Sequence, residues 1–137
     1  MGKLYQTSLE VRGYELDSFG HVNHANYLSY LEFARWKMLE EEGVTLALFK
    51  SWDRFPVIAA IDIQYIKPAF MGDVLTVETQ LLDYKRSSMQ LEQTIRKGAA
   101  TVSVAKIRSV IVSGNGRPAE LPEELEKKWR ALLGKTE

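Results

Sequence analysis

Hydrophobic and polar positions alternate along most of the chain, which is the pattern of strands that bury one face. At the start, Tyr5, Thr7, Leu9 and Val11 recur at every second position. Four later segments also alternate or are rich in β-branched residues, and short polar breaks separate them. The predicted strands are Leu4–Arg12, Val57–Ile66, Val74–Tyr84, Ser88–Lys97 and Ala100–Val112. Short connections between long strands favour antiparallel pairing.

Between the first two strands the pattern predicts a long helix. It should begin at Asn23 or His24 and end at Glu42, because Asn is a favourable N-cap and Gly43 is a typical stop. Apolar residues cover more than one stripe of this helix: Tyr27, Leu28, Tyr30, Leu31, Phe33, Ala34, Trp36, Met38 and Leu39. Such a helix is expected to be buried on most sides, so something must wrap around it.

The remaining segments complete the predicted fold. Thr45–Arg54 is expected to be a connecting turn with a short helical piece, and Pro122–Leu133 a charged terminal helix. No repeat or linker divides the chain, so residues 1–137 are expected to form one domain. The predicted fold class is α+β, with a five-stranded antiparallel sheet wrapped around the long central helix.

Composition narrows the classes of function. The chain has 137 residues, of which 45% are hydrophobic, and 18 basic residues balance 18 acidic ones. Without a clustered basic charge, nucleic acid is not an expected partner. The absence of cysteine excludes a disulfide framework, a thiolate metal site and a cysteine nucleophile. No signal-peptide pattern and no apolar run of membrane-spanning length occur, so we expect a soluble, cytoplasmic protein that does not bind a membrane.

The side chains best suited to catalysis lie in or just after the loop Gly13–Asn23, where the helix begins. The only two histidines, His21 and His24, lie here, and Asp17 precedes them. The N-terminus of a helix offers unpaired N–H groups and the positive end of the helix dipole. A carboxylate and an imidazole beside such donors can hold an acyl carbonyl while water or the carboxylate attacks it. The loop and helix start are therefore the predicted active site.

The same residues carry a resemblance to a known family. The chain resembles the hotdog-fold acyl-CoA thioesterases, in the branch of the 4-hydroxybenzoyl-CoA thioesterase and YbgC-like enzymes. The resemblance lies in two groups of residues: Asp17, Gly20, Val22, His24, Ala25, Tyr27, Tyr30, Glu32, Ala34 and Arg35 in the first, and Tyr65, Pro68, Ala69, Gly72 and Asp73 in the second. It implies a hotdog fold and hydrolysis of an acyl-CoA to a free acid and CoA, without a metal or other cofactor.

The resemblance also implies roles for single residues. Asp17 stands at the place of the catalytic carboxylate, either as nucleophile or as general base. His24 stands where a backbone N–H binds the thioester carbonyl, and its side chain could assist. Asn23 replaces the aromatic residue of many relatives, and this GHVN variant is also similar to long-chain acyl and acyl-carrier-protein thioesterases. Asn23 and Tyr27 are therefore expected substrate contacts near the acyl group.

Each assignment has a structural alternative. Asp17 could be a turn residue, His24 a helix-start hydrogen-bonding residue, and Tyr27 a core residue. Glu32 and Arg35 are three apart on the helix and could simply pair with each other, although some hotdog enzymes use a helix carboxylate. Asp17 and the two histidines could mimic a metal set, but no further ligand pattern appears.

A polar turn between two strands is the predicted clamp for the nucleotide phosphates of CoA. Arg86, Ser87 and Ser88 supply the kind of donors that phosphates need. The alternative is an ordinary solvated hairpin.

The resemblance implies a homodimer, or a dimer of dimers, formed by joining sheets edge to edge. Its active sites would lie between subunits: one chain would bring Asp17 and His24, and the other parts of Val57–Lys67 and Tyr65–Gly72. Two other classes of function stay open. One is a hotdog hydratase or dehydratase acting on enoyl or 3-hydroxyacyl thioesters, and the other is a protein that binds acyl ligands without turnover.

Overall fold

The computed structural model describes residues 3–134 and contains the predicted five-stranded antiparallel sheet. The strands are β1 (Leu4–Glu10), β2 (Phe55–Tyr65), β3 (Val74–Tyr84), β4 (Ser88–Lys97) and β5 (Ala100–Val112). Their order in the sheet is β1-β3-β4-β5-β2, so β1 and β2 form the two edges. Register shifts in three strand pairs add local twist, which helps the sheet to curl.

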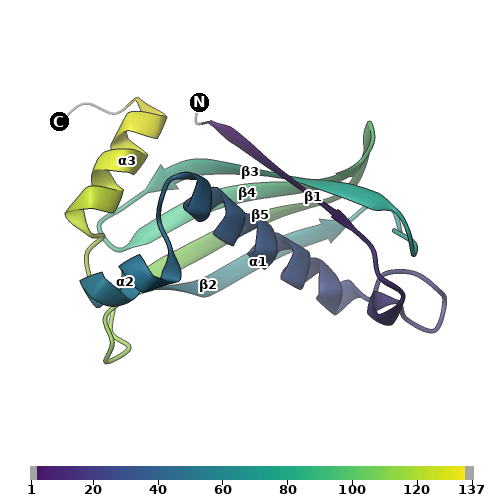
Figure 1. Cartoon of the computed structure of the whole chain (residues 1–137), viewed down its shortest axis with the longest axis horizontal. Helices are drawn as coiled ribbons and strands as arrows, with labels where there is room; N and C mark the ends of the chain where they lie inside the picture. The colour runs from purple at the N-terminus through teal and green to yellow at the C-terminus, as the bar shows by residue number, and fades with distance from the viewer. Residues whose placement is uncertain (1–2, 135–137) are drawn as a thin grey trace.

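The long helix α1 (His24–Glu41) lies across one face of the sheet (Figure 1). The short 3-10 helix η1 (Gly13–Glu15) precedes it, and α2 (Leu46–Trp52) follows it. The C-terminal helix α3 (Glu123–Leu133) packs at the end of the sheet that carries α2, far from the N-terminus of α1. No helix within residues 3–134 is long and apolar enough to span a membrane.

The core lies between α1 and the sheet. Tyr5 on β1 and Val11 directly after this strand are buried, as their alternation predicts. The prediction that α1 is buried on most sides is wrong for a single chain. Leu28 is 39% exposed and Phe33 is 42% exposed, because the sheet covers only one side of the helix. Apolar side chains of α1 are therefore left open to solvent in a single chain.

Candidate active site

A tight turn holds Asp17 directly before α1. The Asp17 N–H donates to the His21 carbonyl at 2.7 Å, and the Gly20 N–H donates to the Asp17 carbonyl at 3.1 Å. Gly20 has a φ of 78°, a left-handed conformation that suits glycine. One carboxylate oxygen, Oδ1 of Asp17, accepts the N–H groups of Phe19 at 2.9 Å and His21 at 3.1 Å. The turn therefore fixes the carboxylate, and within residues 3–134 its Oδ2 accepts no hydrogen bond.

A buried carboxylate that the sequence analysis missed anchors this turn. Glu15 is 6% exposed and accepts the Tyr30 hydroxyl at 2.7 Å and the Arg12 N–H at 2.9 Å. The Arg12 guanidinium also pairs with it at 2.7 Å. The Glu15 carbonyl accepts the Asn23 N–H at 2.8 Å. Glu15 thus connects both ends of the loop to α1. The only feature of the sequence that hints at this role is that a second acidic residue stands two positions before Asp17.

The buried Glu15 carboxylate is expected to make the free energy of unfolding depend on pH in the acidic range. Burial alone would raise the pKa of Glu15, but hydrogen bonds from Arg12 and Tyr30 outweigh burial and hold its pKa below the usual range. A carboxylate with a lowered pKa stabilises the fold above the pKa of the unfolded chain and loses this contribution as the pH falls below about 4. Glu15→Gln should lower the free energy of unfolding at pH 7 by about 2 kcal/mol.

Urea unfolding at pH 7 and at pH 3 measures this effect. The difference between wild type and Glu15→Gln should shrink from pH 7 to pH 3, because the wild-type carboxylate takes up a proton as the pH falls toward its lowered pKa. Glu10→Gln, an exposed change on β1, serves as the control and should leave both values unchanged. An equal difference between wild type and Glu15→Gln at both pH values would contradict the role of the Glu15 charge.

The first turn of α1 leaves one backbone donor open. Asn23 is the N-cap, and its Oδ1 accepts the Ala25 N–H at 2.9 Å. The Asn23 carbonyl accepts the Asn26 N–H at 2.9 Å. Within residues 3–134, the N–H of His24 has no acceptor. This N–H group lies at the positive end of the helix dipole and faces the space before the helix, where it can donate to a bound oxygen atom.

A cavity of about 310 Å³ lies at this helix start and brings together both predicted catalytic residues, Asp17 and His24. Residues on its wall include Asp17, His21, His24, Tyr27, Tyr65 and Lys67. Asn23 does not line it, because its side chain caps α1. Asn23 as a substrate contact therefore gains no support in one chain, and its visible role is structural.

The end of β2 reaches the same cavity. The Tyr65 hydroxyl donates to the His24 carbonyl at 3.0 Å, and the rings of Tyr27 and Tyr65 meet edge to face with centroids 5.3 Å apart. The Tyr27 hydroxyl accepts the Ala69 N–H at 3.3 Å. The sequence analysis expected this strand end from a second subunit. The structure places Tyr65 of the same chain against His24, because β2 runs antiparallel to α1 and ends beside its first turn.

The predicted phosphate clamp lies elsewhere. Arg86, Ser87 and Ser88 follow β3, whose eleven residues separate them from the Asp17 end of the sheet by roughly 36 Å. Ser88 is buried, and Arg86 pairs with Glu120 at 3.0 Å. Within one chain, a strand's length therefore separates these residues from the helix start. A contact from a second copy stays a prediction.

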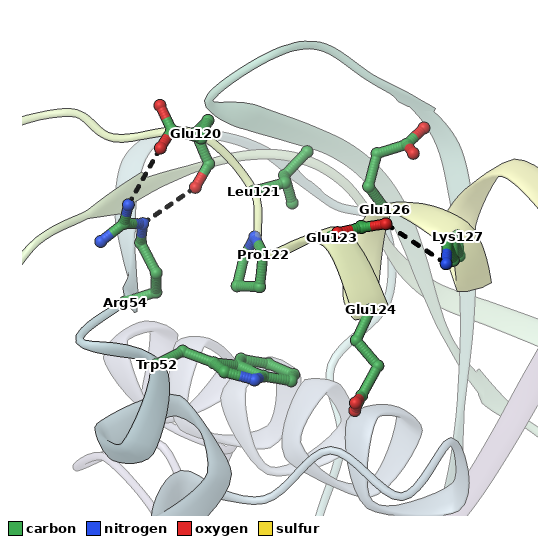
Figure 2. Close-up of a pocket in the computed structure, with 9 residues that line it drawn as sticks. All are labelled: Trp52, Arg54, Glu120, Leu121, Pro122, Glu123, Glu124, Glu126 and Lys127. Atoms are coloured by element: carbon green, nitrogen blue, oxygen red, sulfur yellow. Dashed lines mark hydrogen bonds and ion pairs between the residues drawn. The ribbon is translucent and has the colours of Figure 1, made fainter.

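A larger cavity, with a volume of about 790 Å³, lies at this remote end between α2 and α3 (Figure 2). Arg54 donates to the Glu120 carbonyl and carboxylate, and Glu123 pairs with Lys127. Trp52 and Pro122 face the open space between these pairs. Its charged side chains are largely paired with each other, and it contains none of the residues that the sequence analysis singled out for catalysis. Size therefore does not identify the active site.

The predicted pair on α1 is only partly present. Arg35 Nη1 donates to Gln93 Oε1 at 3.0 Å. The pKa of Arg35 is lowered, because the effect of burial outweighs the opposing effect of the nearby Glu32 charge. Neither residue lines the cavity at Asp17, so a catalytic role for Glu32 gains no support here. Among residues 3–134, no three His, Asp or Glu side chains cluster as metal ligands would, and a metal-free reaction stays a prediction.

Comparison with known proteins identifies the family. The profile of the Thioesterase-like superfamily matches residues 11–129, which include the Asp17 loop, α1 and four of the five strands. The chain belongs to this superfamily.

Individual relatives agree with this assignment. The chain is 36% identical over 129 residues to the long-chain acyl-CoA thioesterase FadM of Escherichia coli, with 89% of this chain and 97% of that protein covered. It is 29% identical over 129 residues to the acyl-CoA thioesterase YbgC of Haemophilus influenzae, covering 91% of this chain and 95% of that one. A thioesterase of Thermus thermophilus, solved with coenzyme A and Zn, is 30% identical with a TM-score of 0.80, covering 96% and 95% of the two chains. The predicted hotdog thioesterase family and fold are confirmed.

Proposed function

We propose that this protein hydrolyses the thioester bond of an acyl-CoA, giving a carboxylic acid and free coenzyme A. The observation that carries the proposal is the convergence of the Asp17 carboxylate and the unpaired His24 N–H on one cavity. The superfamily and the two acyl-CoA thioesterase relatives support the same reaction. An acyl-CoA substrate also agrees with the cytoplasmic location that the sequence predicts.

The chemistry follows from the two groups. The His24 N–H would donate to the thioester oxygen and stabilise the negative charge that develops there. Asp17 would then act in one of two ways. As a general base it takes a proton from water, whose oxygen bonds to the carbonyl carbon while the C–S bond breaks and the thiolate takes up a proton. As a nucleophile its oxygen bonds to the carbonyl carbon while the C–S bond breaks and coenzyme A leaves as a thiolate that takes up a proton; water then hydrolyses the mixed anhydride, which frees the acid and restores Asp17.

Release of free thiol tests the reaction. The protein is mixed with acetyl-, hexanoyl-, decanoyl-, tetradecanoyl- and benzoyl-CoA, and a thiol reagent reports coenzyme A. Turnover of at least one ester is the expected result. A hydratase would change enoyl-CoA without releasing thiol, and a binding protein would bind esters without turning any over. Either outcome would overturn the proposed function.

We also propose that two copies pair through β2 to complete the active site. Within residues 3–134 this edge strand has no second neighbour, and it exposes the apolar side chains of Ile58 and Tyr65. Exposed apolar edge strands invite pairing with another strand. Whether two such dimers associate further stays a prediction.

A charge at the centre of β2 tests the dimer. Ala60 is the midpoint of Phe55–Tyr65, so Ala60→Glu would place two carboxylates near the two-fold axis of an antiparallel pair. Sedimentation should show a dimer for wild type and a monomer for Ala60→Glu, and hydrolysis should fall at least about tenfold with the loss of the partner. Ser8→Glu, on the opposite edge strand β1, should remain dimeric and active. A fully active Ala60→Glu monomer would contradict a site that needs both copies.

A further inference from the structure

Tyr27 is a buried tyrosine on the wall of the Asp17 cavity, and the fold does not use its hydroxyl proton. The residue is 4% exposed and lines the cavity together with Asp17 and His24. Its oxygen accepts the Ala69 N–H at 3.3 Å, and within residues 3–134 its hydroxyl donates to no acceptor. A phenol that accepts one hydrogen bond still has a proton to donate. Because buried polar groups are normally satisfied, an unused donor on a cavity wall points to a ligand that accepts from it.

Helix geometry directs this hydroxyl toward the place where a thioester carbonyl would bind. Tyr27 follows His24 by three residues, so the two residues share one face of α1. Long side chains of a helix point back toward its N-terminus, and the Tyr27 ring therefore extends over the first turn of α1. The unpaired His24 N–H opens at the same end of the helix. The hydroxyl and the N–H are thus two donors that meet one cavity.

Neighbouring groups hold the Tyr27 ring in place. The ring meets that of Tyr30 edge to face with centroids 6.0 Å apart, and that of Tyr65 in the same way at 5.3 Å. The Ala69 N–H fixes the hydroxyl at the end of the ring. A donor that is in place before the substrate arrives does not have to reorganise during the reaction, which is the condition for strong stabilisation of a developing charge.

The surroundings also keep the Tyr27 hydroxyl protonated. Burial raises the pKa of this hydroxyl, and nearby charges, that of Asp17 among them, add to the effect, whereas the bond from the Ala69 N–H opposes it. A phenol in water titrates near pH 10, so a raised pKa leaves the proton in place at neutral pH. Tyr27 is therefore suited to donate a hydrogen bond and unsuited to act as a base.

We infer that Tyr27 is a further catalytic residue, whose hydroxyl donates to the thioester oxygen beside the His24 N–H. This inference rests on the proposed function. During the attack the C=O double bond opens and its oxygen takes up negative charge, which accepts hydrogen bonds from both donors. No proton moves to that oxygen, and the double bond forms again when the C–S bond breaks. The role of Tyr27 is the same whether water or Asp17 is the attacking group.

Tyr27→Phe removes only the hydroxyl and tests this role by kinetics. The kcat for thiol release should fall at least about tenfold, because loss of a donor to the developing charge acts on the transition state. KM should change less than about threefold, since the uncharged carbonyl of the bound ester gains less from the donor. Tyr5→Phe is the matched control: Tyr5 is 3% exposed, and its hydroxyl donates to Glu42 at 2.6 Å, at the opposite end of α1. This control should keep the wild-type kcat and KM.

Infrared spectroscopy of a bound ester separates a catalytic role from a structural one. Asp17→Asn, which should hydrolyse slowly, is mixed with the ester that wild type cleaves fastest in the thiol-release screen, isotope-labelled at the carbonyl carbon. A hydrogen bond to a carbonyl oxygen weakens the C=O bond and lowers its stretching frequency. The frequency should therefore be higher in the double variant Asp17→Asn/Tyr27→Phe than in Asp17→Asn. It should stay unchanged in Asp17→Asn/Tyr5→Phe.

The outcomes separate this inference from the proposed function. A lower kcat together with a higher carbonyl frequency after Tyr27→Phe supports the inference. An unchanged kcat or an unchanged frequency overturns it while hydrolysis stays established. Should Tyr27→Phe fail to fold, an ortho-fluorinated tyrosine in place of Tyr27 decides. This residue keeps the ring and is a stronger donor, so the frequency should fall further, and an unchanged frequency would again overturn the inference. A wild-type protein that releases thiol from no ester would instead refute the proposed function itself.

Discussion

Replacing Asp17 by asparagine is expected to lower kcat for acyl-CoA hydrolysis by at least about 10²-fold, the lower range for loss of a positioned general base. An amide is neither a base nor a good nucleophile, so the expectation holds for both chemical roles of Asp17. The turn itself should survive, because an amide oxygen can still accept the N–H groups of Phe19 and His21. Thiol release measures the rate, and thermal unfolding and sedimentation check that the fold and assembly are unchanged.

A matched control makes the Asp17 result specific. Asp53 lies at the C-terminus of α2, and its Oδ1 accepts the Gly114 N–H at 3.1 Å. Asp53→Asn is the same chemical change in another turn and should keep wild-type activity. Near-normal turnover by Asp17→Asn, or an equal loss in Asp53→Asn, would argue against the proposed site.

The second large effect is expected from His24→Pro, which deletes the backbone donor at the start of α1. Removing one donor from an oxyanion-binding site typically lowers the rate about 10²–10³-fold. Proline is well tolerated at the first position of a helix. The preceding Asn23, at φ −60° and ψ 136°, already has the extended backbone that precedes proline. The fold should therefore remain while the N–H is lost.

Two further variants distinguish the role of the His24 backbone N–H from the role of its imidazole. His24→Ala keeps the N–H and should lose less activity than His24→Pro, and also less than Asp17→Asn. Leu46→Pro places proline at the first position of α2, after the N-cap Thr45, and should leave hydrolysis unchanged. Equal losses in His24→Ala and His24→Pro, with intact structures, would instead assign the essential role to the imidazole.

The sequence alone determined the elements and the local part of the site. Alternation, together with runs of β-branched residues, predicted all five strands to within two residues of their observed ends. The Asn23 cap and Gly43 placed α1 equally well, since helix ends depend on nearby residues. Asp17, His24 and Tyr27 converge because a single turn and the first helical residues carry them. These features depend on short stretches of chain.

Only the tertiary structure decided what depends on residues far apart. Strand order made β2 an edge, and alternation could not predict this, because an edge strand and a central strand can share one pattern. The same order brought Tyr65 to His24 and left Arg86 a strand's length away. The sequence around Glu15 gave no sign that this carboxylate is buried, because its partner Tyr30 lies fifteen residues further along the chain. The cavity beside Asp17 is formed by the loop, the first turn of α1 and the end of β2 together, and the packing of distant side chains is not encoded in any local pattern.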